Sequence, residues 1–207
     1  AVGVEYRHGG QIRQVMAERE LIVSSGTVNT ARLLQVSGVG SAEVLASLGV
    51  DVVHELKGVG ENFQDHFSVR VVAKVKNSLT INELARGPRL IGQFARWATG
   101  RPNILAIVPS LIHIFAKSNE TLDLPDLQGV FAPASFKAGY VGVLDDYPGM
   151  TCGFWPHRPE SVGYIRAKST NPDEYPEIRA NYISAERDRR VLLAGMRLAR
   201  RLLRAAP

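Results

Sequence analysis

The chain has 207 residues, of which 45% are hydrophobic and 22% are charged. These fractions are typical of globular proteins, so the composition excludes a largely disordered chain, and the length fits one medium domain or one and a half small ones. The formal net charge is +5, and residues 185–204 account for all of it, with seven arginines against two acidic residues. The basic character is therefore a property of one C-terminal segment.

Cysteine content and hydropathy exclude further classes. Cys152 is the only cysteine, which excludes an internal disulfide framework and a cysteine-based zinc site. No apolar run approaches the roughly 20 residues that cross a bilayer, so we expect no transmembrane segment. The chain opens on AVGVEY, without an initiator Met or a basic region. We therefore expect no signal peptide, favour a cytoplasmic location and expect an internal segment of a longer protein.

The N-terminal residues are predicted to form strands. Residues 1–6 and 11–15 are expected to pair in a β-hairpin, because the turn at 7–10 contains two glycines. Residues 20–24 (ELIVS) form a short, nearly continuous apolar run, which is typical of a strand covered on both faces.

Two helices are predicted next. Helical spacing extends over 29–36, with Leu33 and Leu34 on the inner side of the helix. Ser41 is placed to cap a second short helix through residue 48, which Gly49 ends. Strand, glycine turn and helix in this order are typical of an α/β unit with parallel strands.

The pattern changes after residue 60. Apolar and polar residues alternate over 69–76, which suits a sheet with one solvated face. A helix is predicted around Leu90, Phe94 and Trp97, and Gly100 ends it. Further strands separated by turn residues are predicted over 104–115, 127–131, 150–155, 163–168 and 177–182.

The predicted fold class is therefore α+β. An antiparallel sheet with flanking helices follows a partial α/β segment. The composition shift falls at 65–68, and we place the domain boundary there, giving residues 1–66 and 67–207.

Two glycine clusters invite a dinucleotide-binding interpretation, at 38–40 and 58–60 (both Gly-Val-Gly). A pyrophosphate-binding fingerprint needs Gly-x-Gly-x-x-Gly between a strand and a helix. The first cluster instead follows a helix, and Glu43 and Phe63 stand where the third glycines would be. We interpret both clusters as helix-cap and turn glycines.

The histidines provide no local metal pair, because no two of the five have the spacing of neighbouring ligands on a helix or strand. His66 closes the polar segment 61–66 (ENFQDH), whose side chains either line a site or bond the backbone of their own loop. No Gly-x-Ser-x-Gly motif is present and Cys152 has no Cys-His context, so nucleophilic catalysis has no support.

A C-terminal amphipathic helix is predicted over 185–204, with Ser184 as its cap. Its arginines suit phosphate binding, but Val191, Gly195, Leu198 and Leu202 form an apolar stripe and no aromatic residues accompany the arginines. We favour a solvated or domain-contacting face over a nucleic-acid-binding one.

Three segments carry a resemblance. GTVNTARLLQVSGVG (26–40) resembles the second signature of the glucose–methanol–choline (GMC) flavoprotein oxidoreductases, with Ala31 in place of the usual Pro or Ser. KGVGENFQDH (57–66) resembles the family's Pro-Gly-Val-Gly-Glu-Asn-Leu-Gln-Asp-His, with Lys and Phe replacing Pro and Leu. Residues 157–184 match its Arg-Pro-Glu-Ser-x-Gly strand and Asn-Tyr-(Leu/Ile)-Ser segment. The three matches occur in order and span nearly the whole chain.

The resemblance implies a segment of an FAD-dependent alcohol oxidoreductase similar to choline dehydrogenases. Such enzymes begin with a Gly-rich flavin-binding unit and end with a catalytic His, and neither motif occurs here. We therefore expect no catalytic residue within the chain, no activity and no bound FAD in isolation. Residues 1–66 would belong to the FAD-binding domain. The implied cofactor-binding residues are Ser25, Gly26, Thr27, Asn62, Asp65 and His66.

Residues 67–207 would form an incomplete substrate-binding domain, whose sheet covers a small-molecule alcohol. The implied substrate-lining residues are Ser68, Phe131, Phe154 and Trp155. Core packing is the alternative role for these aromatic residues, because they lie on alternating strands. Choline-oxidising relatives place a Glu where Ser68 stands, so an uncharged alcohol is expected rather than choline.

The resemblance leaves the partners open. The alternative function is a binding or interaction module that keeps the fold without the chemistry. The expected partners are the alcohol and other segments of the same protein, with no nucleic acid. Self-association is also expected, because residues 20–24 are too apolar to remain solvated.

Overall fold

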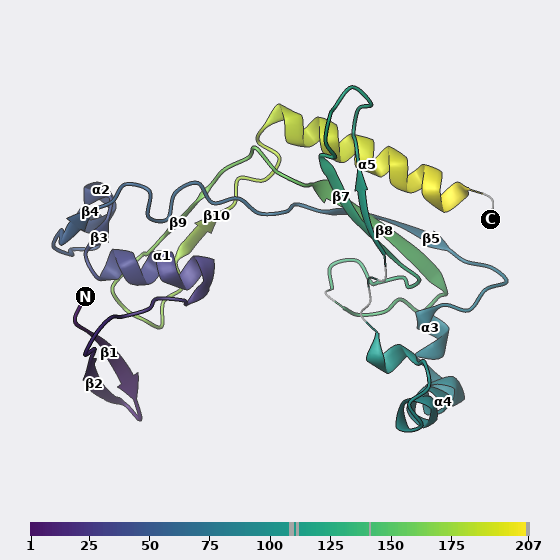
Figure 1. Cartoon of the computed structure of the whole chain (residues 1–207), viewed down its shortest axis with the longest axis horizontal. Helices are drawn as coiled ribbons and strands as arrows, with labels where there is room; N and C mark the ends of the chain where they lie inside the picture. The colour runs from purple at the N-terminus through teal and green to yellow at the C-terminus, as the bar shows by residue number, and fades with distance from the viewer. Residues whose placement is uncertain (108–109, 111, 141, 206–207) are drawn as a thin grey trace. The chain divides into compact units, whose positions relative to one another are not determined.

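The chain forms two compact units in this computed structural model, which describes residues 1–107, 110, 112–140 and 142–205. The first unit contains residues 1–63 and 163–179, and the second contains residues 64–162 and 180–207. The mixture of helices and antiparallel sheets confirms the predicted α+β class (Figure 1). The division into an FAD-binding and a substrate-binding domain at 65–68 stays a prediction.

The first unit begins with the predicted hairpin. Strands β1 (Gly3–His8) and β2 (Gln11–Met16) pair antiparallel, and Gly9 and Gly10 form the turn with positive φ angles of 58° and 78°. The strand predicted over 20–24 is wrong, because this segment has no regular structure and Ile22 is 79% exposed. No strand of the described residues pairs with it, so its backbone has no ladder to join.

Helix α1 (Gly26–Val36) follows, three residues longer at its start than predicted. Its fully buried residue is Gln35, whereas Leu33 is 39% exposed, so the inner side predicted from Leu33 and Leu34 is wrong in part. The Gln35 amide donates to the carbonyls of Val59 and Ile165 and accepts from the Ala167 N–H. These bonds satisfy the polar atoms of Gln35, so this side chain can be buried where an apolar one would be usual.

Short elements complete the first unit. The predicted second helix is α2 (Ala42–Ser47), and Ser41 precedes it without a capping hydrogen bond from its side chain. The strands pair as β3 with β4 in parallel and β9 with β10 antiparallel. Their bounds are Val39–Gly40, His54–Glu55, Tyr164–Arg166 and Glu177–Arg179, so the last two are shorter than predicted.

The second unit is built on a four-stranded antiparallel sheet with the order β5-β8-β7-β6. The strands are β5 (Val69–Lys74), β6 (Ile112–Ala116), β7 (Leu127–Ala132) and β8 (Gly149–Pro156). The single strand predicted over 104–115 is wrong, because Ile104–Ala106 form a 3₁₀ turn, η1, before β6 begins. Residues 108, 109 and 111 of that prediction lie outside the described part of the chain.

Helix α5 (Glu186–Arg204) covers one face of this sheet (Figure 1). The core between them contains Leu127, Cys152, Phe154, Val191 and Ala199. A Cβ atom on Gly195 of α5 would lie 2.7 Å from the Cβ of Phe154, so only glycine permits this close approach. Burial also raises the pKa of the Cys152 thiol.

The start of α5 differs from the prediction, because Ala185 rather than Ser184 is the N-cap residue. The acidic residue in the first turn is instead used to bind a neighbouring loop. The buried Asp188 carboxylate accepts from the backbone N–H groups of Glu160 and Ser161, at 2.9 and 2.8 Å, and from the Ser161 hydroxyl. Asp188 therefore holds the helix against the loop that follows β8.

Two helices lie between β5 and β6. A capping box formed by Thr80 and Glu83 starts α3 (Ile81–Leu84). The helix predicted around Leu90, Phe94 and Trp97 is α4 (Gly87–Ala98), in which Gln93 is buried while Phe94 and Trp97 are 54% and 60% exposed.

Candidate functional site

The second face of the four-stranded sheet carries the candidate site. Residues at alternate positions of each strand point to opposite faces, so Arg70 on β5, Val130 on β7 and Gly153 on β8 share the face away from α5. Arg70 lies opposite Gly153, and Val130 lies opposite the same glycine from the other side. This face includes the exposed Arg70 and the half-buried Val130, whereas the hydrophobic core lies on the other face.

A cavity of about 290 Å³ opens on this face. Its walls combine hydroxyl groups, apolar side chains and one guanidinium group. The lining residues are Ser68, Arg70, Ser110, Val130, Ala132, Phe136, Gly142, Thr151, Gly153 and Trp155. A small organic molecule with one polar end suits such a cavity.

A hydrogen-bonded group adjoins the cavity at Trp155. The Gln128 side-chain oxygen accepts from the indole N–H of Trp155 at 3.2 Å and lies 3.0 Å from Nδ1 of His157. Because this oxygen is an acceptor, Nδ1 of His157 is the nitrogen that donates. The His66 ring lies 5.7 Å from the Trp155 ring, and its Nε2 donates to the His157 carbonyl at 3.0 Å. The polar segment predicted to line a site therefore reaches the cavity through Trp155.

Asp65 stabilises the loop that carries His66. Its carboxylate accepts from the His66 backbone N–H and from the Tyr182 hydroxyl. The hydrogen bond to Asp65, together with burial and the carboxylate charge, raises the pKa of Tyr182. A second hollow of about 450 Å³ lies against Asp65, His66 and His157. The side chains of this segment bond their own loop and border the hollow, and their role in a functional site stays a prediction.

The predicted substrate residues are divided between the two faces of the sheet. Ser68 and Trp155 line the cavity. Phe154 is fully buried beneath α5, and Phe131 lies opposite Cys152 on that same side. The structure therefore gives Phe154 the alternative role of core packing and excludes it and Phe131 from the lining of this cavity.

The predicted cofactor residues are divided between the two units. Asp65 and His66 belong to the second unit, whereas Ser25, Gly26, Thr27 and Asn62 belong to the first. Ser25 precedes α1 without capping it, and the first turn of the helix contains no acidic residue. Its exposed N–H groups are therefore free to face an anion. Asn62 has a φ of 56°, in the left-handed region that Asn tolerates.

Sequence reasoning missed several residues of the site. Arg70, Thr151 and Gln128 contribute to the cavity or to the group beside it. A signal for Arg70 was present, because residues two apart on a strand share a face and Ser68 had already been singled out. Gln128 and Thr151 needed the strand register, which pairs β7 and β8.

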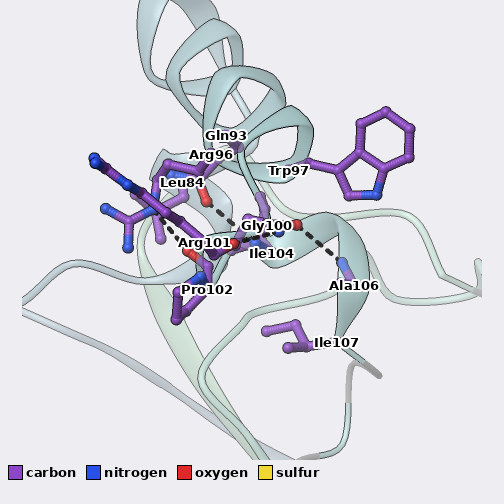
Figure 2. A pocket seen from close by; sticks show the side chains of 11 residues that line it. Leu84, Gln93, Arg96, Trp97, Gly100, Arg101, Pro102, Ile104, Ala106 and Ile107 are labelled. Atoms are coloured by element: carbon purple, nitrogen blue, oxygen red, sulfur yellow. Dashed lines mark hydrogen bonds between the residues drawn. The ribbon is translucent and has the colours of Figure 1, made fainter.

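A larger and more open cavity of about 830 Å³ lies between α4 and η1 (Figure 2). Arg96 and Trp97 of α4 line it with Arg101 and Ile104. Gln93 accepts from the Ile104 N–H at 3.1 Å, and Arg96 donates to the Pro102 carbonyl at 2.6 Å, so internal contacts fix its walls. It is separate from the lining of the sheet cavity, and none of the predicted site residues lines it.

The described part of the chain contains neither a cluster of metal-ligating side chains nor a helix suited to spanning a membrane. Within residues 1–107, 110, 112–140 and 142–205, no three His, Cys, Asp or Glu side chains gather as metal ligands would. The helices described there include none with the length and apolar character to cross a membrane.

Comparison with known proteins gives the class of the protein. The sequence models of the N-terminal and C-terminal parts of GMC oxidoreductases match residues 1–68 and 159–207. The chain belongs to the GMC oxidoreductase family, which confirms the resemblance carried by its three motifs.

Individual proteins are similar to almost the whole length of this chain. The chain is 34% identical to the oxygen-dependent choline dehydrogenase of Photobacterium profundum, over 98% of this chain and 36% of that protein. It is 33% identical to the mitochondrial choline dehydrogenase of Homo sapiens, over 91% of this chain and 32% of that protein. A solved structure of formate oxidase has the same fold, with a TM-score of 0.87 at 21% identity, over 97% of this chain and 40% of that chain. The chain thus spans about a third of the length of the curated relatives it matches.

Proposed function

We propose that this chain is the substrate-side part of an FAD-dependent oxidoreductase that takes a hydride from an alcohol. Residues 1–66 would contribute to the FAD-binding domain and residues 67–207 to the substrate-binding domain. The family supports redox chemistry on a small molecule, and the names of the relatives specify choline for the proteins of Photobacterium profundum and Homo sapiens. The alternative function is a binding module that keeps the fold without the chemistry.

The cavity on the open face of the sheet is the observation that carries this proposal. It lies between apolar walls and hydroxyl groups, and Trp155 connects it to the loop of Asp65 and His66. A cavity that holds a carbon chain beside a fixed polar loop is what positioning an alcohol for hydride removal requires. The Gln128 bond fixes the indole of Trp155, so the wall of the cavity is ordered before a substrate enters.

The donor groups of this chain fit a negatively charged cofactor. FAD, when bound, supplies the acceptor for the hydride, which no side chain can provide. Ser25, Gly26 and Thr27 would approach it through the exposed N–H groups at the start of α1, and Asn62, Asp65 and His66 would lie beside it. The positive φ of Gly26, 78°, keeps this turn open, and an added Cβ would meet no atom within 4 Å.

Ser68 favours a substrate other than choline, although the relatives are named choline dehydrogenases. A carboxylate beside a trimethylammonium group would form an ion pair with it, which the aromatic faces of Trp155 and Phe136 do not supply. Ser68 lines the cavity with a neutral hydroxyl, and no acidic residue is among the lining residues that the structure describes. The group that faces the substrate from this position therefore offers no ion pair to choline.

The test is alcohol-dependent loss of the visible flavin absorption, measured anaerobically in the protein that carries this segment and is loaded with FAD. We expect bleaching by at least one alcohol and slower bleaching in Trp155→Ala, because that side chain forms a wall of the cavity. Arg101→Gln, in the separate cavity beside α4, is the matched control and should bleach at the unaltered rate. Tight FAD binding with no bleaching by any alcohol would favour the non-catalytic module instead.

A further inference from the structure

The sheet cavity contains one group whose charge the proposed function does not use. Arg70 lies on β5 opposite Gly153, so its side chain extends over bare backbone, with its Cγ 3.7 Å from where a Cβ on Gly153 would be. The ion pairs among the described residues do not include Arg70. Its guanidinium is therefore available to a ligand in the cavity.

Arg70 is the one charged side chain among the described residues that line the cavity. Among the described lining residues, Ser68, Ser110 and Thr151 carry neutral hydroxyls, and the others are apolar side chains or glycines, apart from Trp155. The Thr151 hydroxyl donates to the Ala134 carbonyl at 2.7 Å, and the Trp155 indole donates to Gln128, so both donors point to protein atoms. Arg70 is thus the strongest donor that the cavity presents.

We propose that the cavity binds alcohols that carry an anionic group, a carboxylate above all, and that Arg70 determines this specificity. The inference rests on the proposed function, because it names the substrate class of that same site. A planar guanidinium matches a carboxylate with two parallel hydrogen bonds, and the apolar wall formed by Val130 and Phe136 suits the carbon chain between carboxylate and hydroxyl.

An anionic alcohol differs from the uncharged alcohol that Ser68 alone leads us to expect. A serine at that position removes the attraction for a cation without selecting any other charge. Arg70 stands two residues later and lines the same cavity, so the site carries a positive charge where a choline site needs a negative one. Repulsion between the Arg70 guanidinium and a quaternary ammonium group in the same cavity disfavours binding of that group.

Three ligands of equal chain length test the proposal. The probes are 6-hydroxyhexanoate, 6-hydroxyhexanamide and (5-hydroxypentyl)trimethylammonium, which are anionic, neutral and cationic at pH 7. Binding to this chain is followed by the emission of Trp155 in a Trp97→Phe background, which leaves one tryptophan. Trp97 lines the separate cavity beside α4, so its substitution does not touch the site. We expect the carboxylate to bind about 10- to 100-fold more tightly than the amide, as for a charge-assisted hydrogen bond, and the cation to bind most weakly.

Substitutions of Arg70 test whether its side chain causes the preference for the carboxylate. Arg70→Gln should reduce the preference for the carboxylate to within about 3-fold of the amide, and Arg70→Lys should keep part of it, because the charge remains without the planar fork. The matched control is Lys74→Gln on the same strand, which removes an equal charge outside the cavity and should keep the full preference. Circular dichroism shows whether each variant keeps the fold.

Each outcome decides the inference separately from the proposed function. Equal binding of the three probes, tightest binding of the cation, no binding at all, or an equal loss in Lys74→Gln would overturn the role of Arg70. In the FAD-loaded protein, bleaching by 6-hydroxyhexanamide but not by 6-hydroxyhexanoate would also contradict the substrate class while the oxidoreductase proposal stands. Preferential carboxylate binding without bleaching by any alcohol would instead refute the oxidoreductase proposal and leave the anion specificity in place.

Discussion

The two faces of the four-stranded sheet are made from the same strands and serve opposite purposes. The face beneath α5 contains Leu127, Cys152 and Phe154, all nearly or fully buried. The other face contains Arg70, Gln128 and Trp155, which line a cavity or hold its wall. Because side chains alternate along a strand, neighbouring residues are assigned to stability and to ligand binding in turn. Phe154 and Trp155 are the clearest such pair.

The largest expected effect separates these two aromatic residues. Phe154→Ala should lower the free energy of unfolding by about 3–5 kcal/mol, because it empties a fully buried site against Gly195. Trp155→Ala should cost about 1–2 kcal/mol, because this side chain is half-buried and borders a cavity. Urea denaturation of both variants measures the difference, and a larger cost for Trp155→Ala would reverse our assignment of the faces.

The next effect concerns how α5 is held on the covered face. Asp188→Ala should lower the free energy of unfolding by about 2–4 kcal/mol, because it leaves the buried N–H and hydroxyl of Ser161 and the partly buried N–H of Glu160 without their acceptor. Glu186→Ala is the matched control in the same turn, since its carboxylate pairs only with exposed Arg189, and it should cost below about 1 kcal/mol. Comparable losses in both variants would remove the special role of Asp188.

The same carboxylate predicts a dependence on pH. Burial opposes ionisation of Asp188, but the Ser161 hydroxyl and the two backbone N–H groups outweigh it and hold its pKa below the ordinary value of 3.8. The stability that Asp188 contributes is therefore complete above that ordinary value and is lost as the pH falls through the lower, folded-state pKa. Urea midpoints measured from pH 6 to pH 2 should fall less steeply in Asp188→Asn than in the natural chain. Parallel curves would contradict this.

A smaller effect is expected on the open face. Gln128→Ala removes the acceptor of the Trp155 indole and of His157, yet should cost at most about 1 kcal/mol, because these half-buried groups can turn to water. The emission of Trp155 should shift to longer wavelength in the Trp97→Phe background. Gln128→Glu keeps an acceptor oxygen and should retain the original emission, so a shift of equal size in that variant would exclude the hydrogen bond as the cause.

The smallest effect is confined to one hydroxyl group. The bond to Asp65 raises the pKa of Tyr182, so Asp65→Asn should bring it back toward 10.0. Absorbance of the phenolate follows the titration, and subtraction of the Tyr182→Phe curve isolates this tyrosine from the other five. An unchanged titration in Asp65→Asn would show that the carboxylate does not control this group.

Most of the sheet could be predicted from the sequence, because one strand alternates apolar and polar residues with the period of a pleated surface and turn residues separate the others. The alternation at 69–76 located β5, and 127–131 and 150–155 located β7 and β8 to within one residue at each end. It could not show which set of residues faces the helix. Phe154 and Trp155 are both large and aromatic, so the sequence predicted one role for both, and only the packing of α5 against the face that carries Phe154 separates them.

Two further features needed contacts that are distant in the sequence. The apolar run at 20–24 resembles a buried strand, but a strand exists only where a neighbour supplies a ladder, and none of the described residues does so. Gln35 stands beside two leucines in a helix and would be expected on the solvated side. Its three partners, at Val59, Ile165 and Ala167, make it the buried residue instead.

The bonds of Gln35 also set the earliest point during synthesis at which the first unit can be completed. Two of them reach 130 and 132 residues along the chain, to Ile165 and Ala167. A ribosome adding about 5–20 residues per second needs roughly 6 to 26 seconds to cover that interval. Until then the bonds to Ile165 and Ala167 cannot form, and by the end of that interval all four strands of the sheet, the last ending at Pro156, have been made. The first unit, which contains Gln35, therefore becomes complete only after the strands of the sheet in the second unit have been synthesised.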